Sequence, residues 1–130
     1  MRTVTFIVLL FVVSVSKAQT TCTALGQNPS TAFPVCGTSV FSQSTVPYCG
    51  GKSIVTPCQV NSNIPYTDIN PFWYKFTCYT SGTLGFLITP VDLGDDYDWQ
   101  LFDVTGHVLN DVYTNQALIV GSNWSGNTGV

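Results

Sequence analysis

The stretch that decides the fold is residues 72–89, which read FWYKFTCYTSGTLGFLIT. Phe72 to Tyr79 is an aromatic, β-favouring run whose side chains alternate between the two faces of a strand. Thr80-Ser81-Gly82 is a turn signal, and the next run, Thr83 to Thr89, alternates again with three apolar side chains on one side, Leu84, Phe86 and Ile88. Two alternating runs joined by a short glycine-containing loop predict a β-hairpin.

Further short strands are expected downstream of this hairpin. Pro90 ends its second strand, because proline cannot donate a hydrogen bond to the ladder. The pattern then predicts three more strands, Trp99 to Val104, Val108 to Tyr113 and Ala117 to Val120. Short strands at this spacing, in a chain of 130 residues without helical periodicity, predict one all-β domain. We expect an antiparallel, jelly-roll-like β-sandwich.

The half of the chain before the hairpin has a different composition. Residues 19–70 are rich in Thr, Ser, Pro, Gly and Asn and contain four of the five cysteines. Ser39 to Phe41 and Ser53 to Val55 are candidate strands, and Cys49-Gly50-Gly51 is a candidate turn. The sequence therefore predicts a loop-rich, disulfide-stabilised part at 19–70 and a sandwich core at 71–130.

Residues 1–18 have the pattern of a secretory signal peptide. Arg2 supplies the positive end, Val4 to Val15 is mostly apolar, and Ser16-Lys17-Ala18 offers small residues for cleavage after Ala18. The apolar run is shorter than the roughly 20 residues that a spanning helix needs. No second long apolar run follows, so we expect a secreted, cell-surface protein without a membrane span after cleavage.

The cysteines fit an oxidising location outside the cytoplasm, where they form disulfides that stabilise small domains. No C-x-x-C pair is present, which makes a zinc site a poor explanation. The sequence does not select the pairing, and an odd number leaves one thiol free, bonded between molecules, or paired beyond Val130. We expect the last, because Gly121 to Val130 is a loop-like end that follows a strand. The five candidates are Cys22, Cys36, Cys49, Cys58 and Cys78.

Charge and motifs exclude several classes of function. The seven acidic residues are all Asp, and two lysines remain after residue 18, giving that part a net charge of −5. Such a surface cannot neutralise a phosphate backbone, which argues against nucleic-acid binding. The chain has a single histidine, His107, and no G-x-S-x-G or phosphate-binding glycine loop. We therefore expect no enzymatic activity.

One loop concentrates the acidic residues. Asp92, Asp95, Asp96 and Asp98 lie around Gly94, which lets the backbone turn tightly. Calcium takes six to eight oxygen ligands in flexible geometry, so Asp95, Asp96 and Asp98 are candidate calcium ligands. The spacing does not match a helix-flanked calcium loop. The alternative is a solvated turn between strands, in which Asp bonds to its own backbone.

The three tryptophans raise the question of sugar binding. Trp73 and Trp99 lie in predicted strands, where packing against the sheet is the expected role. Trp124 lies in a predicted loop among Ser122, Asn123 and Ser125. It is the candidate for contact with an extracellular glycan.

Three segments resemble a known group of proteins. They are YTDINPFWYKFTC at 66–78, GTLGF at 82–86 and DDYDWQLFDVTG at 95–106. They look like the N-terminal region of large secreted Bacteroidota cell-surface proteins, described as gliding-motility-associated or adhesin-like, which use type IX secretion. More distantly, the order of strands resembles pre-peptidase C-terminal jelly-roll modules, some of which bind calcium. That resemblance implies calcium-binding roles for Asp96 and Asp98, with Asp95 in support.

The resemblance and the composition together suggest two functions. The first is a non-enzymatic cell-surface module for adhesion or extracellular assembly, at the N-terminus of a larger protein, with a surface protein or a glycan as partner. The sequence departs from the resembled proteins because it has no sorting domain and no tandem repeats. The alternative is a carbohydrate-binding accessory module of a secreted polysaccharide-degrading enzyme, with Trp124 in contact with the sugar.

Overall fold

The computed structural model describes residues 22–35, 40, 42, 48–57, 66–126 and 128. These residues form mostly short strands and contain no helix longer than a few residues, so the prediction of a β-rich chain is confirmed at that level. In chain order the elements are η1 (Pro29–Thr31), β1 (Phe33–Pro34), β2 (Gly50–Ser53), β3 (Thr67–Ile69), β4 (Tyr74–Lys75), β5 (Trp99–Phe102), η2 (Leu109–Tyr113), η3 (Gln116–Leu118) and β6 (Ile119–Asn123), where η marks a 3-10 helix.

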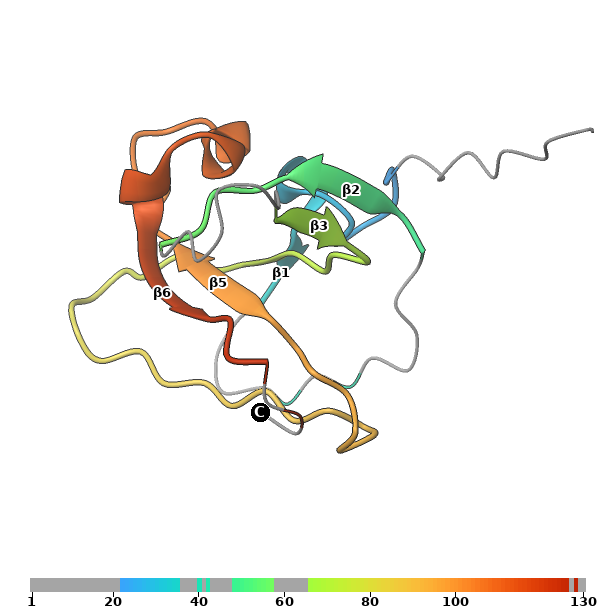
Figure 1. Ribbon diagram of the computed structural model, residues 1–130. Coiled ribbons are helices and arrows are strands. Elements are labelled where there is room, and N and C mark those ends of the chain that lie inside the picture. Colours follow the sequence, from blue (N-terminus) through green and yellow to red (C-terminus); the bar gives the residue numbers. More distant parts are fainter. Residues whose placement is uncertain are drawn as a thin grey trace, which may run out of the picture.

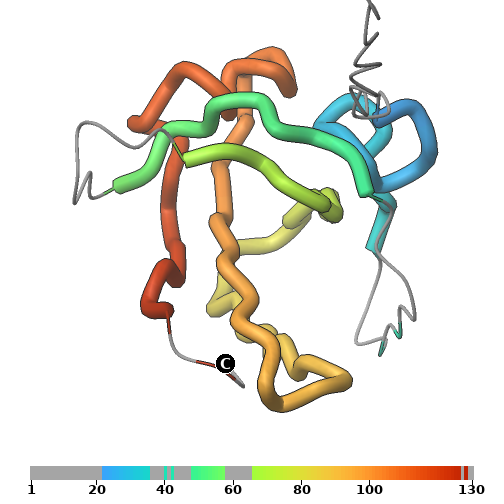
Figure 2. Tube along the Cα trace, turned by 45° about the vertical axis from the view of Figure 1, so that its right-hand side comes forward, coloured from blue at the N-terminus to red at the C-terminus, as the bar shows by residue number. Residues whose placement is uncertain are grey.

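The described strands pair two by two. β2 with β3 and β5 with β6 are antiparallel, whereas β1 and β4 are parallel. Figure 1 shows the β2–β3 and β5–β6 pairs, with the 3-10 helices η2 and η3 at one end of β5 and β6. In Figure 2 the β2–β3 pair crosses over one end of the β5–β6 pair. The described residues thus form three small sheets, two antiparallel and one parallel.

The buried core lies where the N-terminal segment, β2, β3 and η2 meet. Its most buried residues are Ala32, Cys49, Thr56, Val112, Tyr113 and Leu118. The Trp73 ring packs beside them, with its centroid 5.8 Å from that of Tyr113 and 6.0 Å from that of Phe102. The buried Tyr113 and the half-buried Trp73 and Phe102 thus add aromatic contacts to this small core.

A disulfide joins the first described residue to this core. Cys22 bonds to Cys49, with the two Cα atoms 5.4 Å apart. Cys78 is a free, exposed thiol. Cys36 and Cys58 lie outside the described residues. The prediction of a disulfide in the first half is confirmed.

The predicted hairpin of Phe72 to Tyr79 with Thr83 to Thr89 is wrong. Only Tyr74 and Lys75 form a strand, and they pair with Phe33 and Pro34. The Trp73 carbonyl accepts from the Phe33 N–H at 2.8 Å, and the Trp73 N–H donates to the Gly26 carbonyl at 2.6 Å. The backbone of this run therefore bonds to the N-terminal segment. Glycines at 82 and 85 also weaken a second strand, because glycine loses much backbone entropy on ordering.

The C-terminal strand predictions have mixed outcomes. β5 confirms four of the residues predicted as Trp99 to Val104. Val108 to Tyr113 is not a strand, because Leu109–Tyr113 forms η2 through hydrogen bonds such as that of the Asp111 N–H with the Val108 carbonyl, at 2.9 Å. The run Ala117 to Val120 is divided between η3 and β6.

Near the N-terminus, the expected turn Cys49-Gly50-Gly51 is instead the start of β2, which ends at Ser53. The signal segment 1–18 and most of the candidate strand Ser39 to Phe41 lie outside the described residues. In the part of the chain that is described, no helix is long and apolar enough to cross a bilayer.

Candidate functional site

Residues 76–98, called the open arm below, connect β4 to β5 without forming a strand. Figure 1 shows the open arm, in yellow to orange, as a wide loop that swings away from the three sheets before it enters β5. The arm is attached at Phe86, whose ring lies edge-on to Trp99 with centroids 5.0 Å apart. Pro90, a few residues further along the arm, is buried. The arm is therefore an exposed loop with a few fixed points.

The open arm carries an unusual number of exposed apolar side chains. Tyr79 is 94% exposed, Leu87 89% and Val91 86%. The full set of exposed large apolar residues in the arm is Phe76, Tyr79, Leu84, Phe86, Leu87, Val91, Leu93 and Tyr97. Single exposed apolar residues are ordinary on a protein surface, whereas many in one segment mark an interaction surface.

The tip of the open arm is the acidic loop. The Asp92 carboxylate accepts from the Gly94 N–H at 2.8 Å, and the Asp92 carbonyl accepts from the Asp95 N–H at 3.0 Å. These bonds make the local Asp-stabilised turn that the sequence offered as the alternative to a calcium site. The Tyr97 hydroxyl is 3.5 Å from an Asp95 carboxylate oxygen. All of these side chains are exposed.

The acidic side chains of the tip are not matched by cations. Partial burial, and then the negative charge of Asp96, raise the pKa of Asp98 above its ordinary value. Within the described residues the ion pair found is His107 with Asp111, at 3.4 Å, which lies outside the arm. No three acidic, histidine or cysteine side chains among those described gather closely enough to hold a metal ion. Calcium at Asp95, Asp96 and Asp98 would need further oxygen ligands from backbone carbonyls and water, and it stays a prediction.

Trp124 is partly buried and packs against another aromatic ring. Its centroid is 5.0 Å from that of Tyr66, in an edge-to-face arrangement. The indole nitrogens of Trp124 and Trp73 are buried and find no hydrogen-bond partner among the described atoms. Trp73 and Trp99 contact other rings, as expected for packing residues. A glycan contact at Trp124 stays a prediction.

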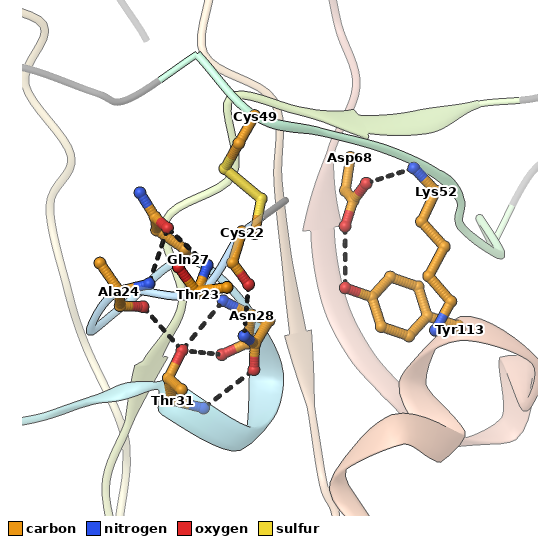
Figure 3. The surroundings of a disulfide bond; sticks show 10 residues. All are labelled: Cys22, Thr23, Ala24, Gln27, Asn28, Thr31, Cys49, Lys52, Asp68 and Tyr113. Atoms are coloured by element: carbon orange, nitrogen blue, oxygen red, sulfur yellow. Dashed lines mark hydrogen bonds between the residues drawn. A yellow bond between two sulfur atoms is a disulfide. The ribbon is translucent and has the colours of Figure 1, made fainter. Parts of the chain in front are cut away.

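A second group of polar side chains ties β2, β3 and η2 together. One oxygen of Asp68 accepts from the Lys52 backbone N–H at 2.6 Å, and the other accepts from the Tyr113 hydroxyl at 2.8 Å. Figure 3 shows Asp68 between these two donors, with the Lys52 side chain running to the Tyr113 ring. The Lys52 Nζ atom lies 3.6 Å from the centroid of that ring, close enough for a cation–π interaction.

This group has a structural role. Burial of Tyr113, followed by its hydrogen bond to Asp68 and the charge of that carboxylate, raises the pKa of the phenol well above its ordinary value. Tyr113 therefore stays protonated at physiological pH and acts as a hydrogen-bond donor. Lys52 is occupied with the same ring, so neither side chain is available to a ligand.

Sequence reasoning identified the acidic tip but not the exposed apolar arm behind it. The sequence pattern predicts that Leu84, Phe86 and Ile88 share one side of a strand. These residues are in fact less exposed than Leu87, and Phe86 does contact Trp99. The signal that could have revealed the open arm is the set of strand-weakening residues within it, Gly82, Gly85 and Pro90.

No protein family, curated protein or solved structure matches this chain.

Proposed function

We propose that this chain is an exported, non-enzymatic module of a cell surface that serves adhesion or extracellular assembly, as the N-terminal part of a larger protein. The observation that carries the proposal is the open arm, where large apolar side chains such as Tyr79, Leu87 and Val91 stand almost fully exposed. Exposed apolar segments of this kind are typical of surfaces that bind another macromolecule.

The disulfide supports the location outside the cytoplasm. Cys22–Cys49 links two segments of the loop-rich half, and bonds of this type persist where the environment is oxidising. The polar group around Asp68 supports a rigid frame, because it fixes β2, β3 and η2 to one another. A rigid frame that holds the open arm in place is suited to binding another macromolecule, because less conformational freedom is lost on binding.

We also propose that the antiparallel pairs are the facing layers of a jelly-roll-like sandwich. The Gln100 side chain of β5 donates to the Val55 carbonyl, just after β2, at 2.9 Å. This contact and the Trp73 ring beside Phe102 support a packed interface between the two pairs. An experimental structure with β2, β3, β5 and β6 in one continuous sheet would contradict this architecture.

The adhesion proposal is tested with microspheres coated with the exported protein. Coated spheres should attach to cells that produce the protein, and Leu87→Ser/Val91→Ser should reduce attachment severalfold. Val108→Ser/Val120→Ser is the matched control, because both valines are exposed but lie outside the arm. Attachment no greater than that of albumin-coated spheres would overturn the proposal.

A further inference from the structure

The backbone of the open arm is available for pairing. No hydrogen bond between described residues involves the backbone of residues 76–91. The runs Phe72 to Tyr79 and Thr83 to Thr89 alternate and are rich in aromatic and β-branched residues, which favour a strand once a partner supplies the ladder. Without a partner, Gly82, Gly85 and Pro90 weaken a strand formed by this segment. A strand-like segment with unpaired N–H and C=O groups is a template for an added strand.

The charge of the arm restricts which partner can supply that strand. Residues 76–98 contain four aspartates and no Lys, Arg or His. Partial burial, and then the negative charge of Asp96, raise the pKa of Asp98, and no lysine, arginine or histidine of the arm offsets that charge. A partner surface with positive charge removes this repulsion, whereas a negative one increases it.

Residues 19–130 supply little complementary charge. After residue 18 the lysines are Lys52, which lies over the Tyr113 ring, and Lys75 in β4. The single histidine, His107, lies 3.4 Å from Asp111. Residues 36–47 and 58–65 contain no charged side chain. A second copy would bring an arm with the same four aspartates. The complementary charge therefore comes from a segment outside residues 19–130.

We infer that the open arm, residues 76–98, is the docking surface for a lysine- or arginine-bearing apolar segment of another protein, which binds as an added β-strand. The partner's apolar side chains cover Tyr79, Leu87 and Val91. Its cations lie against Asp95, Asp96 and Asp98. The inference rests on the proposed binding function and names the chemistry of the partner.

The test uses the full exported protein and synthetic peptides. The probe is a peptide of alternating lysine and valine. Peptides with lysine replaced by glutamate, or valine replaced by serine, separate the contributions of charge and apolar contact. Calorimetry measures affinity, and amide hydrogen exchange shows which backbone groups become protected.

The lysine–valine peptide should bind saturably and protect amides within residues 76–91. Asp95→Asn/Asp96→Asn/Asp98→Asn and Leu87→Ser/Val91→Ser should each weaken its affinity by about tenfold or more. Val108→Ser/Val120→Ser should leave it unchanged. The altered side chains of the arm are exposed, and an unchanged melting temperature verifies that each variant is folded.

Several results would overturn the inference. They are the absence of saturable binding, equal affinity for the lysine–serine or glutamate–valine peptide, protection confined to residues outside the arm, and self-association that buries the arm. If the peptide fails while coated microspheres still attach to cells, the adhesion function stands and the partner chemistry is wrong. If the peptide binds while the microspheres do not attach, the adhesion function is the part that fails.

Discussion

The Tyr113 hydroxyl donates to the Asp68 carboxylate at 2.8 Å, across 45 positions of sequence. This bond connects η2 to β3, and the same carboxylate also accepts from the backbone of β2. Three elements from distant parts of the chain therefore share one acceptor group. Since Tyr113 is buried and Asp68 is half-buried, the bond is partly shielded from competition with water.

Removing the donor should destabilise the fold. Tyr113→Phe leaves one oxygen of the half-buried Asp68 without its partner, and loss of a hydrogen bond of this kind costs about 0.5–1.5 kcal/mol. Urea denaturation measures this loss in the free energy of unfolding. Tyr97→Phe is the control, since Tyr97 is exposed and its contact with Asp95 is long, at 3.5 Å. Its effect should stay within about 0.5 kcal/mol, and equal effects would contradict the role of Tyr113.

The same phenol should make stability depend on alkaline pH. Its pKa is raised in the folded chain, so above pH about 10 the folded state retains a proton that the unfolded state has lost. The contribution of Tyr113 is complete below that pH and is lost as the pH rises towards the folded-state pKa. Thermal melts from neutral to alkaline pH should show a steeper fall for the natural chain than for Tyr113→Phe. Burial also raises the pKa of Tyr74, which both proteins retain, so parallel curves would refute the role of Tyr113.

The Cys22–Cys49 bond should be a major source of stability. It joins positions 27 apart, and a loop of that size predicts a loss of about 3–4 kcal/mol for Cys22→Ser/Cys49→Ser. Chemical denaturation measures the loss, and mass spectrometry of proteolytic fragments verifies the pairing. Cys78→Ser should change stability by less than about 0.5 kcal/mol, because this thiol is free and exposed. A loss as large as that of the double variant would mean that Cys78 forms a structural bridge.

Gly50 should not tolerate a side chain. Its φ is +98°, and an added Cβ would collide with the Asp68 carbonyl oxygen. Gly50→Ala should therefore lower the free energy of unfolding by at least about 1–3 kcal/mol. Gly82→Ala is the matched control, because nothing lies within 4 Å of its added Cβ and its φ is not positive. Similar melting temperatures for the two variants would contradict this account of β2.

The parts of the fold that were predictable from sequence are those determined by local pattern. Alternation identified β5, and Asp with Gly identified the turn at Asp92 to Asp95, because such patterns act over a few residues. The strand prediction for Val108 to Tyr113 failed, although the β-branched and aromatic residues favoured it. Leu109–Tyr113 instead forms η2, in which the consecutive residues Val112 and Tyr113 are both buried. In a half-buried strand, consecutive side chains point to opposite faces, so only one of the two would be buried.

Long-range relationships could not be predicted. The pairing of Phe33 with Tyr74 and the choice of Cys49 as partner of Cys22 join segments whose own patterns do not specify each other. The candidate site follows the same division. The acidic tip was predictable from the aspartates alone. The exposure of Leu87 and Val91 was not, because it depends on the hydrogen bonds of the preceding run with the N-terminal segment around Phe33.

The parallel pair β1–β4 also sets an order of events during synthesis. Phe33 leaves the ribosome well before Tyr74, so β1 cannot find its partner until β2 and β3, which lie between them in the chain, have emerged. Both cysteines of the Cys22–Cys49 bond precede β4 in the chain and can meet while its strand is still being made. Oxidation can thus come before this pairing, and a nascent chain halted before Tyr74 would contain both cysteines and the β2–β3 pair but lack the β1–β4 ladder.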